Sequence, residues 1–263
     1  MTDRSGLAAT REGAVLWLRL QRPEARNGID GPTREALESA LLDADTDRSV
    51  RVVVITGSGR DFCTGADLAG GDGPAPTDVL GYRKALVPFQ RLFRTLWELE
   101  TPVISAVNGT VAGVGWMLAL LADLVVAAED ARWTHVFSRR GMAPHAGDPY
   151  YLPRILPFHV LNEIALLSDT ITTPDLARWG AVNRVVPAGE VEATARALAE
   201  RVGAGPTLSY GQAKRLYRRS LESDLTTALA EEATATAMLS PTNDRAEGVA
   251  ALLERRPATF TGS

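Results

Sequence analysis

The sequence predicts an α/β fold, because short β-branched apolar runs alternate with longer segments of helical spacing. Two of these runs, residues 51–56 and 101–107, have the composition of buried strands. A glycine-rich loop follows each of them, at residues 57–68 and 108–115. The chain therefore contains two strand-then-loop units, and each loop can offer a backbone N–H group to a ligand.

The other elements follow from the same patterns along the chain. Residues 15–20 predict the first strand, residues 33–42 and 78–98 predict helices, and the Gly-, Pro- and Asp-rich residues 69–77 predict a flexible loop. Residues 116–128 are apolar almost throughout and predict one buried helix. Amphipathic, alanine-rich helices are expected near the C-terminus at residues 161–167, 173–180, 191–202, 208–222, 225–239 and 244–253.

Length and composition indicate a globular protein of one domain, or of one large domain with a helical extension. The chain has 263 residues, of which 45% are hydrophobic, and a net charge of −4. This charge argues against a general nucleic-acid surface. The single cysteine, Cys63, excludes an intrachain disulfide and fits a reducing cytoplasm, and packing is its expected role.

Targeting and membrane signals are not apparent in the sequence. Residues 1–6 lack the basic stretch and apolar segment of a signal peptide. No uncharged apolar run approaches the roughly 18 residues of a membrane span. We therefore expect a cytoplasmic protein without a membrane partner.

The loop at residues 108–115 has the properties of a site that stabilises negative charge. The first N–H groups of a helix have no internal partner and carry partial positive charge. Gly113 and Gly115 would let a ligand oxygen approach this backbone closely. Two N–H donors, one from each loop, would form an oxyanion hole for a carbonyl oxygen.

Several segments together resemble the crotonase (enoyl-CoA hydratase/isomerase) superfamily, in its order and spacing over nearly the whole chain. The matching segments are RPEARN (22–27), VVITG (53–57), FCTGADL (62–68), PVISAVNG (102–109), ADL (122–124), GAVNRVVP (180–187), and Glu247-Gly248 with Arg256-Pro257 and Phe260. The resemblance implies a crotonase-type spiral of ββα repeats over residues 1–190. It also implies a C-terminal helical region over residues 191–263 that builds homotrimers, which could pair into hexamers.

The resemblance further implies an acyl-thioester substrate, with acyl-CoA first and a carrier-protein thioester as an alternative. Its carbonyl would be held by the N–H groups of Ala66 and Val114. Coenzyme A would be part of the substrate, and neither a separate cofactor nor a metal is expected. Arg26 could bind a coenzyme A phosphate, although a solvated turn arginine explains it equally well. The expected substrate-binding residues are Arg26, Asp67, Leu68, Gly113, Trp116, Met117 and Phe137.

The chain departs from the hydratases at the two positions that carry their catalytic glutamates. Met117 and Phe137 stand at these positions, and neither side chain can transfer a proton. Ordinary hydration of an enoyl thioester is therefore not expected.

The remaining acid–base candidates lie in the polar loop at residues 139–153. His145 occupies the place where related isomerases and dehalogenases carry an aspartate, and a histidine can act as a general base near neutral pH. Asp148 could orient the His145 imidazole or act itself, or it could simply begin a turn before Pro149. Arg139 and Arg140 could meet an anionic substrate or lie in a solvated turn.

Two other side chains have weaker claims to a role. Strand alternation places Trp133, His135 and Phe137 on one face, and packing is the favoured interpretation of His135. Tyr82 could be an acid, but its helical spacing favours a core position.

Taken together, the sequence predicts an enzyme that stabilises the enolate of an acyl thioester and catalyses an isomerase- or lyase-type reaction. Two alternatives stay open. One is hydrolytic C–C cleavage of a β-diketone, and the other is a non-catalytic thioester-binding homologue.

Overall fold

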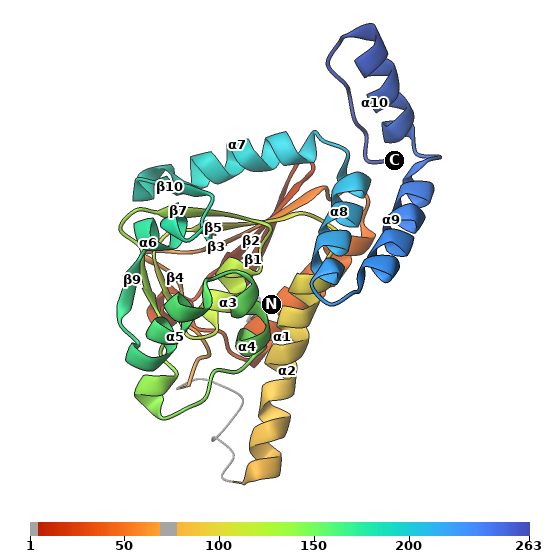
Figure 1. Cartoon of the computed structure of the whole chain (residues 1–263). Coiled ribbons are helices and arrows are strands. Elements are labelled where there is room, and N and C mark those ends of the chain that lie inside the picture. The colour runs from red at the N-terminus through yellow and green to blue at the C-terminus, as the bar shows by residue number, and fades with distance from the viewer. Residues whose placement is uncertain (1–4, 69–77) are drawn as a thin grey trace.

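The computed structural model describes residues 5–68 and 78–263 (Figure 1). Its strands are β1 (Leu7–Glu12), β2 (Val15–Leu20), β3 (Val52–Gly57), β4 (Asp61–Cys63), β5 (Val103–Val107), β6 (Thr110–Ala112), β7 (Leu124–Ala128), β8 (Arg132–Thr134), β9 (Thr170–Thr172) and β10 (Arg184–Val186). Its α-helices are α1 (Gly31–Thr46), α2 (Val79–Glu98), α3 (Gly115–Leu120), α4 (Asp148–Tyr151), α5 (Phe158–Leu167), α6 (Thr173–Arg178), α7 (Val191–Gly203), α8 (Thr207–Ser220), α9 (Leu225–Leu239) and α10 (Asn243–Glu254). The predicted flexible loop at residues 69–77 lies outside the described residues.

The strands form two sheets, and from β3 to β8 successive strands belong to the two sheets in turn. The larger sheet has the order β1-β2-β3-β5-β7-β10, and the smaller has the order β4-β6-β8-β9. In this part of the chain, each strand of the larger sheet is followed by a strand of the smaller sheet. Within each sheet these strands pair in parallel. Helix α2 follows strands β3 and β4, and helix α3 follows strands β5 and β6. This arrangement confirms the predicted α/β spiral of ββα repeats.

The core lies on both faces of the larger sheet. Every residue of β3 and β5 is buried, which explains why these strands are uninterrupted apolar runs rather than alternating ones. Helix α7 crosses one face of this sheet and buries the small residues Ala195 and Ala199 against it (Figure 1). The division at residues 190 and 191 stays a prediction, although α7 packs on the spiral.

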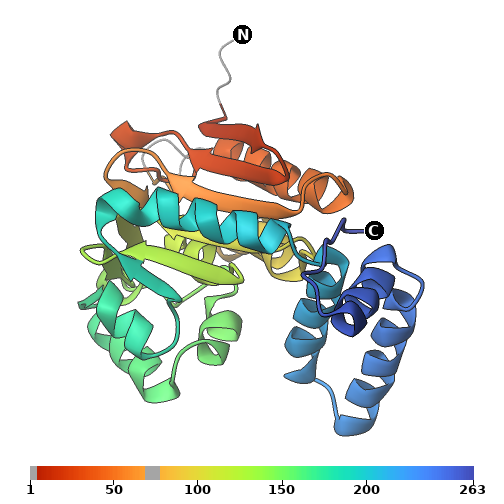
Figure 2. The same cartoon turned by 90° about the horizontal axis from the view of Figure 1, so that it is seen from above.

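Helices α8, α9 and α10 project to one side of the body formed by the two sheets (Figure 2). Large apolar side chains on these helices are exposed to solvent in the single chain: Tyr217, Leu221, Leu225, Leu229, Met238, Leu252 and Leu253. The predicted trimer or hexamer stays a prediction.

Two sequence expectations about the elements are wrong. Residues 116–128 form a short helix, α3, followed by the strand β7, because Asp123 interrupts the apolar run and pairs with β5 through its backbone and side chain. The strand at residues 15–20 is the second strand rather than the first. Its neighbour β1 is largely exposed and lacks an apolar signal.

No helix within residues 5–68 and 78–263 is long and apolar enough to cross a membrane.

A largely buried ionic cluster connects α8 to the end of the larger sheet. The Asp123 carboxylate accepts hydrogen bonds from Lys214 Nζ at 2.6 Å, Arg218 at 2.9 Å and the Val103 amide at 2.8 Å. Burial lowers the pKa of Lys214, and the neighbouring Asp123 charge partly offsets this effect. The carboxylate therefore compensates two cations that have been removed from most of their water.

Replacing Asp123 with alanine should reduce the free energy of unfolding by about 3 kcal/mol, because two buried cations lose their counter-charge. Chemical denaturation followed by circular dichroism measures the change. Glu98→Ala is the matched control, since it removes a carboxylate from the exposed Arg94–Glu98 pair and should change stability little. Equal effects of the two substitutions would contradict this account of α8 docking.

Candidate active site

The two glycine-rich loops predicted from the sequence pack directly against each other. Strands β4 and β6 pair in parallel, so the loops that follow them leave the smaller sheet at the same edge. Gly65 has φ +101°, and a Cβ atom there would lie 3.1 Å from the Ala112 carbonyl oxygen and 3.5 Å from the Val114 nitrogen. A Cβ atom on Gly115 would lie 2.3 Å from the carbonyl oxygen of Cys63. Glycine is therefore needed at both positions for this approach.

The Ala66 and Val114 amides lie on these abutting loops. Ile29 fixes the first loop on both sides of Ala66, since its N–H donates to Gly65 O at 2.8 Å and its carbonyl accepts from Asp67 N at 2.9 Å. Within the described part of the chain, neither the Ala66 nor the Val114 amide donates a hydrogen bond. Two free N–H donors on neighbouring loops can serve an oxygen that gains negative charge.

An aromatic cluster lies next to the loop that carries Val114. Trp116, Met117 and Phe137 are buried, and the Trp116 ring meets Trp133 at 5.6 Å and His135 at 6.0 Å between centroids. The His135 ring in turn lies 4.8 Å from that of Phe137. Trp133, His135 and Phe137 are all buried, as the predicted common face requires. Met117 and Phe137, which the sequence predicts to stand at the hydratase glutamate positions, are therefore buried apolar side chains, and Phe137 belongs to this cluster.

Asp148 binds His135, which the sequence analysis assigned to packing. The His135 Nε2 and Asp148 Oδ2 atoms are 2.8 Å apart, and both side chains are nearly inaccessible to solvent. Asp148 is therefore hydrogen-bonded to His135 rather than to His145, and its role in the site stays a prediction. His135 was the signal in the sequence that could have indicated this pair, because a buried imidazole among aromatic rings needs a polar partner.

His145 lies on the other side of Phe137 and is half-buried. Its ring lies 4.7 Å from that of Phe137, and its Nδ1 atom has no hydrogen-bond partner among the described residues. Burial lowers the pKa of His145 below its ordinary value of 6.5, and the negative charge of Asp148 acts in the opposite direction. The imidazole is therefore mainly neutral at pH 7 and can accept a proton.

The loop that carries His145 and Asp148 depends on a glycine. Gly147 has φ +89°, and a Cβ atom there would lie 2.3 Å from the ring of Tyr151. Asp148 follows at the start of α4, where its amide donates to the His145 carbonyl at 3.2 Å. The turn therefore directs the two side chains to different partners.

Three predicted substrate-binding residues have structural partners or lie at the surface. Arg26 forms a two-point ion pair with Asp61, at 2.9 and 3.2 Å, so its guanidinium is already engaged. Asp67 accepts a hydrogen bond from Arg22 at 2.7 Å, whereas Leu68 is largely exposed. Their roles in binding a substrate stay predictions.

The remaining candidates are readily placed. Cys63 is fully buried, and burial raises its pKa to about 12, in agreement with a packing role. Tyr82 is 40% exposed, so the core position favoured for it is wrong, and its hydroxyl lies 4.0 Å from the sulfur of Met142. Arg139 and Arg140 lie in an exposed turn. Among residues 5–68 and 78–263, no cluster of His, Cys, Asp or Glu could hold a metal ion.

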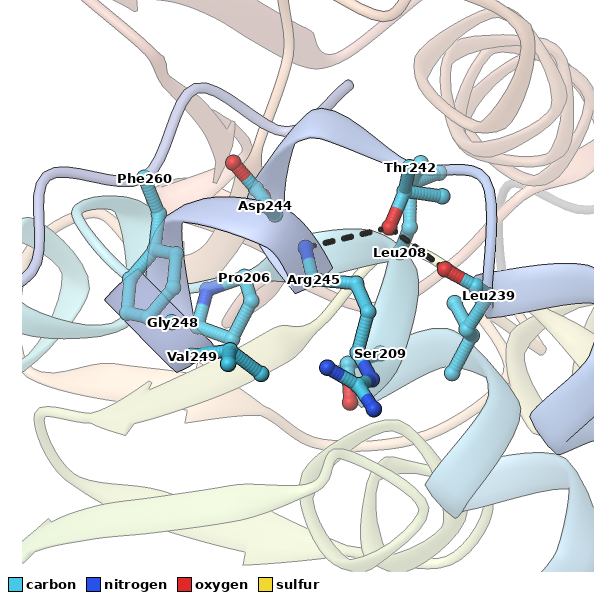
Figure 3. Close-up of a pocket in the computed structure, with 10 residues that line it drawn as sticks. All are labelled: Pro206, Leu208, Ser209, Leu239, Thr242, Asp244, Arg245, Gly248, Val249 and Phe260. Atoms are coloured by element: carbon cyan, nitrogen blue, oxygen red, sulfur yellow. Dashed lines mark hydrogen bonds between the residues drawn. The ribbon is translucent and has the colours of Figure 1, made fainter. Parts of the chain in front are cut away.

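A pocket of about 250 Å³ lies elsewhere, between α8, the end of α9, α10 and the C-terminal segment (Figure 3). Thr242 caps α10 at its edge by accepting from the Arg245 amide and donating to the Leu239 carbonyl. None of the predicted site residues lines this pocket, so it is separate from the two loops.

Replacing Gly115 with alanine should separate the two loops, because the new methyl group cannot coexist with the Cys63 carbonyl at its present position. We expect a loss of stability and at least a tenfold loss of thioester affinity, since about 1.4 kcal/mol of lost interaction is sufficient for that. Thermal unfolding and titration calorimetry measure the two effects. Gly189→Ala is the control, because nothing lies within 4 Å of its Cβ position, and wild-type affinity in Gly115→Ala would refute the constraint.

The comparisons with known proteins agree with this arrangement. Residues 10–263 match the enoyl-CoA hydratase/isomerase family. The chain is 37% identical to a "probable enoyl-CoA hydratase" of Rhodobacter capsulatus, over 92% of this chain and 93% of the relative. It is 33% identical to the 1,2-epoxyphenylacetyl-CoA isomerase of Escherichia coli K12, over 95% of this chain and 96% of the relative.

A solved structure shares the fold over almost its full length. The enoyl-CoA hydratase from Bacillus anthracis superposes with a TM-score of 0.90 at 28% identity, covering 98% of this chain and all of the other. The family match, the relatives and the crotonase fold agree. The chain therefore belongs to the enoyl-CoA hydratase/isomerase family of enzymes, which act on acyl-CoA.

Proposed function

We propose that the protein is an isomerase-type enzyme that forms the enolate of an acyl-CoA in an oxyanion hole made by the Ala66 and Val114 amides. One observation carries this proposal: two amides without partners lie on loops that glycine brings into contact. Both donors belong to backbone fixed by neighbouring strands. They would therefore need little rearrangement when charge develops on the thioester oxygen.

The proposed acid–base group is His145. Its imidazole is half-buried, burial lowers its pKa, and its ring is adjacent to that of Phe137, which stands at one of the predicted hydratase glutamate positions. Asp148 is less suitable because it is almost fully buried and is hydrogen-bonded to His135. Met117 and Phe137 have no exchangeable proton to offer.

The reaction that follows is a proton transfer between two carbons. His145 takes a proton from the carbon next to the carbonyl, and the electron pair of that C–H bond moves toward the thioester oxygen held by the two amides. The imidazolium then returns the proton to a different carbon, so the double bond moves and no water is consumed. The Escherichia coli relative is an isomerase, which supports this class.

We also propose that the protein forms a homotrimer or hexamer in the cytoplasm. The exposed apolar side chains of α8, α9 and α10 support an assembly, because such patches are usually covered in solution. The proposed reaction uses no cofactor apart from the coenzyme A of the substrate, although a carrier-protein thioester fits the same chemistry.

Hydrolysis of a β-diketone is a second candidate. The observation that favours it is the buried His135–Asp148 pair, since a histidine held by a carboxylate can activate water. Binding of a free diketone without binding of acyl-CoA would favour this function over the first.

His145→Ala should abolish exchange of the protons next to the thioester carbonyl, because the base that removes them would be missing. The measurement is deuterium incorporation into a panel of saturated and unsaturated acyl-CoAs in heavy water, followed by mass spectrometry. Rates should fall at least about a hundredfold, which is the usual contribution of a general base.

His159→Ala is the matched control, because it removes an exposed histidine on α5 and should exchange at the wild-type rate. Exchange that survives in His145→Ala would move the base to another residue, with Asp148 tested next. Tight acyl-CoA binding without any exchange in the wild type would identify a non-catalytic thioester-binding protein.

The exchange rate should be independent of pH near 7 and should fall about tenfold per pH unit below the pKa of His145, because only the neutral imidazole accepts a proton. Burial places that pKa below 6.5. The Asp148 charge raises it, so Asp148→Asn should move the acidic limb to still lower pH. A fall in the exchange rate that begins above pH 6.5, or that Asp148→Asn moves to higher pH, would contradict the assignment of His145 as the base.

A further inference from the structure

A cavity of about 500 Å³ lies between the C-terminal end of α2, helix α4 and helix α8. None of the residues predicted for the active site lines it. Its walls combine charged side chains with three aromatic ones, those of Trp97, Tyr150 and Tyr151. A volume of this size with aromatic walls and a few convergent polar groups is typical of a site for a small molecule.

Positive charge predominates on the walls of this cavity. Four arginines and two glutamates line it: Arg94, Arg215, Arg218, Arg219, Glu98 and Glu222. Three of the arginines have an acidic partner at 2.6 to 2.9 Å, in the pairs Arg94–Glu98, Arg218–Asp123 and Arg219–Glu231. Within the part of the chain that the structure describes, Arg215 forms neither a hydrogen bond nor an ion pair. Its guanidinium is thus available, and such groups bind carboxylates and phosphates.

Tyr151 adds a hydrogen-bond donor to the same walls. The residue is 7% exposed, and its hydroxyl has no hydrogen-bond partner among residues 5–68 and 78–263. Burial raises the pKa of Tyr151 above its ordinary value of 10, so the hydroxyl keeps its proton and can donate it. The charges that act on this hydroxyl are those of Glu98, Arg94 and Arg218, which all line the cavity. An unpartnered donor among cations indicates an anionic acceptor that the chain does not supply.

The aromatic walls are held in place by contacts within the protein. The guanidinium carbon of Arg218 lies 4.7 Å from the centroid of the Trp97 ring, and that of Arg154 lies 3.7 Å from the centroid of the Tyr150 ring. The Trp97 and Tyr151 rings also meet, with centroids 5.1 Å apart. Walls that are already ordered lose little conformational entropy when a ligand binds.

We propose that this cavity binds a small organic anion and that the bound anion changes the affinity of the protein for acyl-CoA. Arg215 and the Tyr151 hydroxyl receive the carboxylate or phosphate group of the ligand. Its apolar part lies against Trp97 and Tyr150. This site is separate from the proposed oxyanion hole and can be occupied in the absence of a thioester.

One residue connects the cavity to the turn that carries the proposed base. The Tyr151 ring covers Gly147, where a Cβ atom would lie 2.3 Å from it, and the Tyr151 amide donates to the Gly147 carbonyl at 3.0 Å. Gly147 stands between His145 and Asp148 in this turn. An anion that fixes the Tyr151 hydroxyl therefore acts on the backbone that positions both side chains.

The exposed apolar side chains of α8 lie away from the cavity. An α-helix turns by about 100° per residue, so Tyr217 and Leu221 lie on the opposite side of α8 from Arg215 and Arg219. A contact between copies through Tyr217 and Leu221 therefore leaves the arginine side of the helix accessible.

The first test is titration calorimetry with benzoate, phenyl phosphate, inorganic phosphate and the neutral analogue benzamide, without any thioester. Benzoate or phenyl phosphate should bind at least about tenfold more tightly than benzamide, as hydrogen bonds to a charged group allow. The two anions distinguish a carboxylate site from a phosphate site. Inorganic phosphate should bind more weakly than the better of them, because it makes no contact with the aromatic walls.

Two substitutions should weaken anion binding at least about fivefold, because each removes a donor to the charged group: Arg215→Ala and Tyr151→Phe. Arg201→Ala is the matched control, since it removes an exposed helical arginine outside the cavity and should leave affinity unchanged. Glu98→Ala should strengthen binding at least about twofold, because it removes a negative charge from the wall and frees Arg94. A merely structural role of these residues would not produce effects of opposite sign.

The second test measures the coupling between the two sites. A saturating concentration of the better anion should change the Kd of butanoyl-CoA at least about threefold, and butanoyl-CoA should change the Kd of the anion by the same factor. Arg215→Ala should abolish this effect at an anion concentration that saturates the wild type but not the variant. Direct competition in the active site would instead survive in Arg215→Ala.

Four results would overturn the inference. They are equal affinity for benzamide and both aromatic anions, anion binding that Arg215→Ala and Tyr151→Phe leave unchanged, an unchanged Kd of butanoyl-CoA in the presence of bound anion, and a coupling that survives in Arg215→Ala. The proposed function is tested separately, because proton exchange is measured without the anion.

Discussion

The close approach of two loops is the constraint on which the rest of the site depends. The loops after β4 and β6 meet at Gly65 and Gly115, where any larger residue would place its Cβ atom against a backbone carbonyl. The parallel pairing of β4 with β6 brings the loops to the same edge, and Ile29 holds the first of them from the other side. Backbone packing, rather than any side chain, therefore leaves two amides free at one place.

The chemistry around these amides is set by side chains that can change without disturbing the loops. Met117 and Phe137 are buried apolar side chains, and Phe137 belongs to an aromatic cluster. Two histidines lie nearby, because the rings of His135 and His145 each contact the ring of Phe137. In the proposed function, the two loops stabilise an enolate, and the group that moves the proton differs from the glutamates of the hydratases.

Burial gives the two histidines different properties. His135 is fully enclosed and held by Asp148, so its position is fixed. His145 is half-buried, its Nδ1 atom has no hydrogen-bond partner among the described residues, and burial lowers its pKa. In the proposed function, the less enclosed His145 is the histidine that exchanges a proton with the substrate.

The sequence by itself determined the α/β class, the two strand-then-loop units and nearly all the helices after residue 157. Local patterns are sufficient there, since β2 and α9 have the predicted bounds and Asp78 caps α2 at the predicted start. The run at residues 116–128 was misassigned because an apolar segment has no periodicity that separates a buried helix from a buried strand. Only the tertiary structure decided that α3 ends at Leu120 and that Asp123 forms ion pairs with Lys214 and Arg218, from a helix about 90 residues later.

The same limit applies to the site. Glycine spacing marked both loops, but the partners of the charged side chains depend on how distant segments meet. Asp148 is hydrogen-bonded to His135, 13 residues earlier, rather than to His145, which is nearer in the sequence. Arg26 is likewise engaged by Asp61, 35 residues away. Side-chain pairing is a property of the packed chain, and sequence patterns report mainly on local backbone and burial.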